Sequence, residues 1–125
     1  MLRLLMIVGT GGFIGTLMRF LLSRYIQEQT TSSFPLGTFI INVAGCFLIG
    51  IFYGLAERGN LMSTEWRLFL TVGICGGFTT FSTFSGDNLA LLRGSEFLYF
   101  GLYAGLSVFL GLLATYLGNT LIKAI

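Results

Sequence analysis

The sequence predicts an all-α integral membrane protein, because its composition is strongly apolar and its apolar residues gather in four long stretches. Of its 125 residues, 54% are hydrophobic and 10% are charged, and the mean hydropathy is +0.87. A soluble domain normally carries about 25% charged residues. The composition therefore excludes an ordinary soluble domain before any motif is considered.

Four stretches are long enough to cross a bilayer, which takes about 20 mainly apolar residues per helix. The predicted helices cover residues 4–26, 36–56, 66–92 and 97–122, and they form a single transmembrane domain over residues 1–125. Only short connectors remain. They leave no room for a soluble catalytic module, and the net charge of +2 does not predict a nucleic-acid partner.

The inventory of reactive side chains argues against an enzyme. The chain has no histidine, and its two cysteines, Cys46 and Cys75, lie inside apolar stretches, where we interpret them as buried free thiols. Without histidine, zinc and haem sites and Ser-His-Asp catalysis lose their usual ligands or bases. The chain also lacks a Gly-x-x-x-x-Gly-Lys loop, so no nucleotide partner is predicted.

Positive charges give a weak signal for the orientation of the chain in the membrane. Four helices place both termini on one side, which collects Arg3, Arg58, Arg67 and Lys123. The other side collects Arg24 and Arg93, and Arg19 lies just inside the membrane near it. Positive residues normally mark the cytoplasmic side. So small a bias is expected of a chain that inserts in both orientations, although some ordinary small membrane proteins share it.

Glycine spacing predicts close contacts between helices. The pairs Gly11/Gly15, Gly50/Gly54 and Gly101/Gly105 each have the small-xxx-small spacing that lets two backbones approach in lipid. Because four helices alone leave little interior space for a protected polar path, we expect packing between subunits and at least a dimer.

Polar residues inside the bilayer are the best pointers to function, since an unsatisfied polar group in hydrocarbon is costly. Asn42 lies midway along the second predicted helix, and Tyr103, Ser107 and Thr115 form a hydroxyl stripe on the fourth. Each either lines a pathway or bonds a neighbouring helix or its own backbone.

Two charged residues near the membrane also have two interpretations. Arg19 either extends to the headgroups or is a fixed positive charge at a vestibule that attracts anions. Asp87 closes the third predicted helix and is either an interfacial carboxylate that faces water or a group that handles ions.

The third predicted helix is interrupted by residues that are poor helix formers. Its middle reads Gly-Gly-Phe-Thr-Thr-Phe-Ser-Thr-Phe-Ser from Gly76 to Ser85, and we expect a break near residues 76–80. A break at this depth is tolerated only where it is buried or lines a cavity, and it frees carbonyl oxygens for cations. Phe81 and Phe84 share one helix face, and their positive ring edges suit a small anion.

This segment resembles the signature of the Fluc family of fluoride channels, which are small dual-topology bacterial fluoride exporters. The resemblance extends over the whole chain, because the runs Gly11 to Gly15, followed by Arg19, and Gly37 to Phe47 also resemble that family. It implies an antiparallel, dual-topology homodimer with two antiparallel pores in the cell inner membrane.

The resemblance also implies roles for individual residues. Gly76 and Thr79 would give backbone carbonyls to a structural sodium ion at the dimer interface, two from each subunit, and Arg19 would be the arginine of the first helix. The implied fluoride pathway consists of Phe81, Phe84, Asn42, Ser82, Thr83, Tyr103, Ser107 and Thr115. Two positions depart from the family pattern: Gly111 stands in place of a hydroxyl residue, and Asp87 in place of a longer glutamate.

The predicted function is passive export of fluoride through a selective channel, which needs no energy coupling. One alternative is a small multidrug-type exporter, but such transporters depend on a membrane-embedded carboxylate that exchanges protons for drug. No acidic residue occurs in the first three quarters of the first or third predicted helix. Another alternative is a membrane subunit that only scaffolds a partner and transports nothing.

Overall fold

Helices make up all the regular secondary structure of residues 1–59 and 62–125, which are the residues described by this computed structural model. Three crossings are continuous: α1 (Leu2–Glu28), α2 (Leu36–Glu57) and α6 (Phe97–Ala124). The remaining crossing consists of α3 (Thr64–Arg67), a π-helix η1 (Leu68–Cys75), α4 (Gly76–Phe78) and α5 (Phe81–Arg93). Each of the four crossings is long and apolar enough to span a membrane. The prediction of an all-helical membrane protein with a broken third crossing is confirmed.

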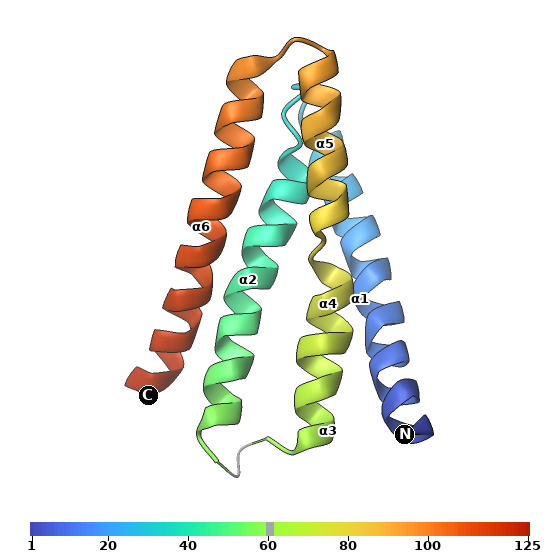
Figure 1. Ribbon diagram of the computed structural model, residues 1–125, viewed down its shortest axis with the longest axis vertical. Helices are drawn as coiled ribbons and strands as arrows, with labels where there is room; N and C mark the ends of the chain where they lie inside the picture. The colour runs from blue at the N-terminus through green and yellow to red at the C-terminus, as the bar shows by residue number, and fades with distance from the viewer. Residues whose placement is uncertain (60–61) are drawn as a thin grey trace.

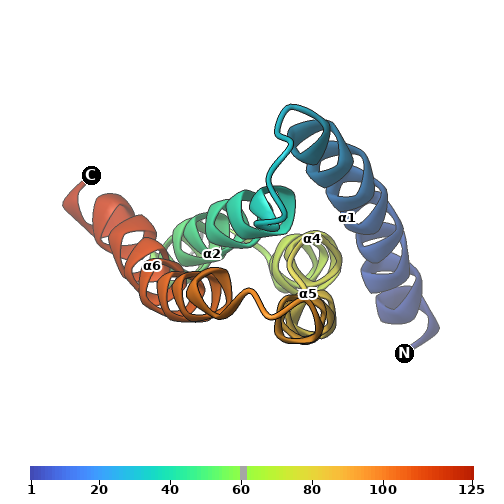
Figure 2. The same ribbon diagram turned by 90° about the horizontal axis from the view of Figure 1, so that it is seen from above.

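The crossings form an open arrangement with two outer helices. Both termini lie at the same end of the molecule, and the break between α4 and α5 lies near the middle of its length (Figure 1). Seen from above, α2 and the α4–α5 column lie between α1 on one side and α6 on the other (Figure 2). Accordingly, α2 packs mainly against α6, and α1 packs mainly against η1 and α4.

Glycines set the close approaches within the chain. A methyl group built on Gly11 would lie 2.8 Å from the carbonyl oxygen of Phe69 and 2.9 Å from the Cα atom of Gly73. Between α2 and α6, a methyl on Gly50 would strike the Thr115 carbonyl, and one on Gly118 would strike the Phe47 carbonyl. The backbones of these helix pairs are therefore in direct contact, as small residues permit in lipid.

The third predicted glycine pair behaves differently. Methyl groups built on Gly101 and Gly105 would meet no atom within 4 Å, and both residues are exposed on α6. Within one chain, this pair therefore contributes nothing to helix packing.

The π-helix was not predicted from the sequence. It occupies eight residues directly before the break, and within it the Thr71 hydroxyl donates back to the Arg67 carbonyl at 2.6 Å. π-Turns are rare and gather at functional sites. The wide π-turns lie where Gly73 meets Gly11, so the irregular backbone is covered by α1.

Substituting Gly118 by alanine should destabilise the protein, because the added methyl would collide with the Phe47 backbone, which cannot move away cheaply. We expect a loss of about 1–3 kcal/mol, seen as a lower thermal midpoint in detergent. Gly101→Ala is the matched control on the same helix. Its methyl enters open space, so better helix propensity should raise the midpoint slightly. Equal midpoints for the two variants would contradict the packing described for α2 and α6.

Candidate functional site

The break in the third crossing is completed by a side chain from α2. Thr79 and Thr80 have extended backbones, with φ and ψ of −99° and 146° and of −150° and 130°. The Asn42 amide donates to the Thr80 carbonyl at 3.3 Å, and its oxygen accepts from the Thr80 amide at 3.1 Å. The Thr80 hydroxyl then caps α5 by accepting from the Thr83 amide at 3.4 Å. One asparagine thus replaces the lost helical acceptor of the Thr80 amide and adds a donor to the Thr80 carbonyl.

The carbonyl oxygens of Gly76 and Thr79 are among those that lose their helical partners at the break. In a continuous helix the amides of Thr80 and Thr83 would donate to the carbonyls of Gly76 and Thr79, but here they donate to Asn42 and to the Thr80 hydroxyl. Hard cations such as sodium prefer oxygen ligands. The two carbonyls expected from the sequence to bind sodium therefore have the chemistry that such an ion requires.

Arg19 contacts the carbonyl of Gly77, which lies between Gly76 and Thr79 in the chain. Its Nε atom donates to the Gly77 carbonyl at 3.2 Å, across the contact of α1 with α4. The close approach of the backbones allows this, because a methyl on Gly77 would lie 2.6 Å from the Gly12 carbonyl oxygen. The guanidinium therefore bonds the interrupted backbone, an arrangement that neither interpretation of the sequence predicted.

The aromatic residues of α5 form a continuous row with α6. The ring centroids of Phe81 and Phe84 are 5.5 Å apart, and those of Phe84 and Tyr103 are 5.1 Å apart, with tilted rings. Phe81 is 76% exposed in the single chain, whereas Tyr103 is fully buried. Phe81 is thus the exposed end of this row of rings, and Tyr103 is its buried end.

A cavity of about 350 Å³ opens beside Phe81 and Phe84, between α2, the break and α6. Asn42, Ser107 and Thr115 line it together with the two phenylalanines. The remaining lining residues are Cys46, Thr79, Thr80, Val108, Gly111 and Leu112. We refer to this cavity as the Phe81 groove. Its lining combines phenylalanine rings, hydroxyl groups and an amide, and contains no ionisable acid or base other than one thiol.

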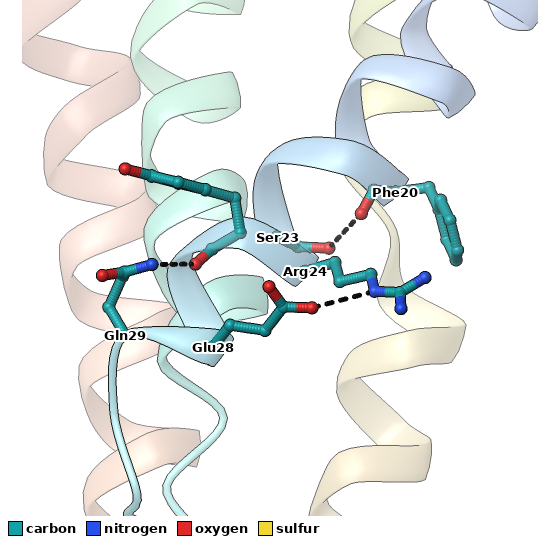
Figure 3. Close-up of polar contacts among 6 residues, drawn as sticks. Phe20, Ser23, Arg24, Glu28 and Gln29 are labelled. Carbon is teal, nitrogen blue, oxygen red and sulfur yellow. Dashed lines mark hydrogen bonds and ion pairs between the residues drawn. The ribbon is translucent and has the colours of Figure 1, made fainter.

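A second, more polar cavity of about 490 Å³ lies where α1 turns into α2. Arg24, Glu28 and Asp87 line it with Ser23, Gln27, Ser33, Pro35 and Thr38. Figure 3 shows the α1 side of this region, where Arg24 forms an ion pair of 3.0 Å with Glu28 and the Ser23 hydroxyl donates to the Phe20 carbonyl. We refer to this cavity as the Arg24 cavity.

The two cavities lie one helical turn apart along α5. Phe84 lines the Phe81 groove and Asp87, three residues later, lines the Arg24 cavity. The Tyr103 hydroxyl lies between them and donates to the Asp87 carboxylate at 3.0 Å. Asp87 and Phe84 therefore lie on neighbouring turns of α5, and each of them lines one of the two cavities.

The hydroxyl groups predicted for the pathway differ in their availability to a ligand. Thr115 donates to the Cys46 carbonyl at 3.0 Å or the Gly111 carbonyl at 3.1 Å, and Tyr103 donates to Asp87. In the described part of the chain, the Ser107 hydroxyl is buried and has no hydrogen-bond partner. Ser107 is therefore the hydroxyl of this stripe with a free donor.

Some residues of the predicted fluoride pathway line one cavity in the structure, and the others lie outside it. Asn42, Phe81, Phe84, Ser107 and Thr115 share the Phe81 groove, and the break supplies Thr79. Ser82 contacts the Thr80 hydroxyl at 3.1 Å, and Thr83 gives its amide to that same hydroxyl. Neither side chain is part of the groove lining, and Tyr103 lies behind Phe84.

Arg24 and Cys46 are two of the cavity-lining residues that sequence reasoning missed. That reasoning treats Arg24 only as an orientation charge and Cys46 only as a buried thiol. The spacing of four residues between Arg24 and Glu28, which is typical of a helical ion pair, is a signal that could have identified Arg24. The position of Cys46 depends on the register between α2 and α6, for which the sequence carries no signal.

Comparison with known proteins places the chain among close relatives. The profile of the family described as CrcB-like protein, Camphor Resistance (CrcB), matches residues 6–119. The chain is 44% identical to the fluoride-specific ion channel FluC of Flavobacterium psychrophilum over 116 residues, which are 93% of this chain and 94% of the relative. It is 45% identical over 117 residues to the protein of that name from Phocaeicola vulgatus, covering 94% of this chain and 96% of that one. For Bacteroides fragilis the identity is 48% over 114 residues, or 89% of each chain.

Replacing Asn42 by alanine should weaken the fold more than the loss of a side-chain amide between α2 and α6. The change leaves the amide of Thr80 without its partner, at about 1–3 kcal/mol for the unsatisfied group, and removes one of the donors to the Thr80 carbonyl. Asn119→Ala is the control, since Asn119 makes one longer bond of 3.4 Å to the Gly50 carbonyl. Thermal midpoints in detergent measure the difference, and an Asn42 variant as stable as the Asn119 variant would argue against the bridging role.

Proposed function

Because the chain belongs to the CrcB-like family, whose relatives above are named fluoride-specific ion channels, we propose that it is a passive channel that exports fluoride. The family assignment and the names of the relatives agree with the channel predicted from the sequence. They favour neither a proton-coupled exporter, nor a scaffold subunit, nor an enzyme.

The observation that carries this proposal is the composition of the Phe81 groove. It brings together two phenylalanines, one amide and one free hydroxyl, with no charged side chain in its lining. Ring edges and hydrogen-bond donors attract a small anion. Because no fixed positive charge holds the anion, binding is weak enough for release, which conduction requires.

The two cavities suggest the order in which fluoride meets these groups. The Arg24 cavity is the aqueous entrance, where the Arg24 guanidinium offsets the nearby carboxylates of Glu28 and Asp87. From there the ion passes the edge of Phe84 and reaches the Phe81 groove. Asn42 has one amide proton beyond that given to Thr80, and Ser107 has its hydroxyl proton, so both can donate to the anion there.

A second copy of the chain would cover the groove. Polar backbone and side chains at this depth cannot face lipid without a large penalty, yet the groove is open and Phe81 is exposed in the single chain. We therefore propose a homodimer with two pores. The weak charge bias supports antiparallel subunits, inserted in both orientations in the cytoplasmic membrane.

Sodium would stabilise such a dimer through the break. The Gly76 and Thr79 carbonyls of each subunit lack helical amide partners, and Gly76 is exposed in the single chain. Two carbonyls from each subunit would give a bound sodium ion four oxygen ligands. The role of the ion is structural, since it holds the interrupted helices in place.

Replacing Phe81 or Phe84 by isoleucine should reduce fluoride efflux from liposomes to the level of protein-free vesicles, because isoleucine has no positive ring edge for the anion. Purified protein is reconstituted, and efflux is followed with a fluoride electrode.

Phe109→Ile is the matched control, because Phe109 is exposed on α6 and is not part of the groove lining. It should conduct as wild type does. Undiminished flux in both the Phe81 and the Phe84 variants would contradict the assigned pathway, provided that each variant elutes as wild type does in size exclusion.

Removing sodium should lower both fluoride flux and dimer stability, since the carbonyls at the break would lose their shared cation. Protein exchanged into N-methylglucamine chloride is compared with protein kept in sodium chloride, by efflux and by size exclusion at low protein concentration. Full flux and an unchanged dimer after exhaustive exchange would rule out a structural sodium ion.

A further inference from the structure

The polar stripe on α6 has a gap at its middle turn. Residues 107, 111 and 115 follow one another at one-turn intervals, and all three line the Phe81 groove. Ser107 and Thr115 carry hydroxyl groups, but Gly111 has no side chain. An ion that moves along this stripe would therefore lack a donor from α6 between Ser107 and Thr115.

The side chain of Cys46 lies at that gap, on the opposite helix. A methyl group built on Gly111 would be 3.4 Å from the Cys46 Sγ atom, which is ordinary contact distance. Cys46 also lines the groove. The thiol of α2 thus lies at the level where a side chain at position 111 would begin.

The Cys46 thiol is free to donate a hydrogen bond. The Thr115 hydroxyl proton is directed to the carbonyls of Cys46 and Gly111, so Thr115 cannot donate to an ion without giving up one of them. Among the described residues, the Ser107 hydroxyl has no partner, and no hydrogen bond involves the Cys46 sulfur. Ser107 and Cys46 therefore have uncommitted donors in the groove, in addition to the second amide proton of Asn42.

We propose that the Cys46 thiol is a hydrogen-bond donor to fluoride, in the place left by the missing side chain of Gly111. This inference rests on the proposed function, and it extends the pathway to a residue of α2 that the hydroxyl stripe does not include. A thiol is a weak donor, which suits a site that the ion must leave as readily as it enters.

The other thiol does not share this environment. Cys75 is 1% exposed at the end of η1 and is not part of the groove lining. It remains in every Cys46 variant and therefore serves as an internal control for thiol reagents.

Fluoride efflux from reconstituted liposomes tests the donor role. Cys46→Ser keeps a donor and should conduct at least as fast as wild type, whereas Cys46→Ala should be slower by roughly tenfold, the effect of one lost hydrogen bond to an anion. Adding Gly111→Ser to the alanine variant returns a donor from α6. It should recover about half of the wild-type rate, since the two sites are in contact and are therefore coupled.

A second readout uses the chemistry of the thiol. Methyl methanethiosulfonate converts an accessible thiol to its methyl disulfide, which removes the donor and adds bulk to the groove. It should inhibit wild type and leave Cys46→Ser unaffected, although that variant retains Cys75.

The outcomes separate this inference from the proposed function. Wild-type efflux with an undiminished Cys46→Ala rate would overturn the inference and leave the channel intact. The inference would also be overturned if Cys46→Ser were as slow as Cys46→Ala, or if the reagent left wild type uninhibited. Absence of efflux from wild-type liposomes would overturn the proposed function, and the donor role with it.

Discussion

Two hydrogen bonds between the Asn42 side chain and the backbone of Thr80 allow a membrane-spanning helix to be interrupted in the bilayer. In hydrocarbon, water cannot satisfy backbone groups that have lost their helical partners, so an interruption needs a partner from the protein. Asn42 supplies an acceptor and a donor in the positions that an adjacent peptide unit would occupy. The extended conformation of Thr79 and Thr80 depends on this pairing.

Other features of the site follow from the interruption. Because the helix restarts at Phe81, the ring of that residue projects from the first turn of α5, beside the groove. Because Thr80 and Thr83 give their amides elsewhere, the carbonyls of Gly76 and Thr79 are available to a cation. Groups suited to an anion and groups suited to a cation thus arise from one short stretch of backbone.

Electrostatics in the groove is dominated by dipoles. The charge of Arg19 is directed to the Gly77 carbonyl, and the ion pair of Arg24 and Glu28 lies in the outer cavity. Within the groove, the groups available to an ion are amide, hydroxyl, thiol and ring edges. Each such group gives a modest interaction, so the proposed path consists of several shallow sites in series.

Much of this fold could be predicted from the sequence, because hydropathy over a long window and a Gly-Gly pair beside hydroxyl residues are local signals. The four crossings and the break near residues 76–80 are of this kind. The π-helix could not be predicted, since it accompanies the contact of Gly73 with Gly11, which are distant in the chain. The bond of Arg19 to Gly77 and the approach of Cys46 to Gly111 depend likewise on how two helices are rotated against each other.

The position of the bridging residues along the chain also bears on biogenesis. Arg19 and Asn42 both precede Thr80, so α1 and α2 have been synthesised before the interrupted segment leaves the ribosome. If crossings enter the bilayer in order, the donors and acceptor that the segment needs are already in the membrane when it arrives. If a residue of α6 took the place of Arg19 or Asn42, the backbone groups at the break would lack that partner until the last crossing was inserted. The N-terminal half of the chain thus supplies the hydrogen-bond partners of the third crossing, which is the least hydrophobic of the four, before that crossing is inserted.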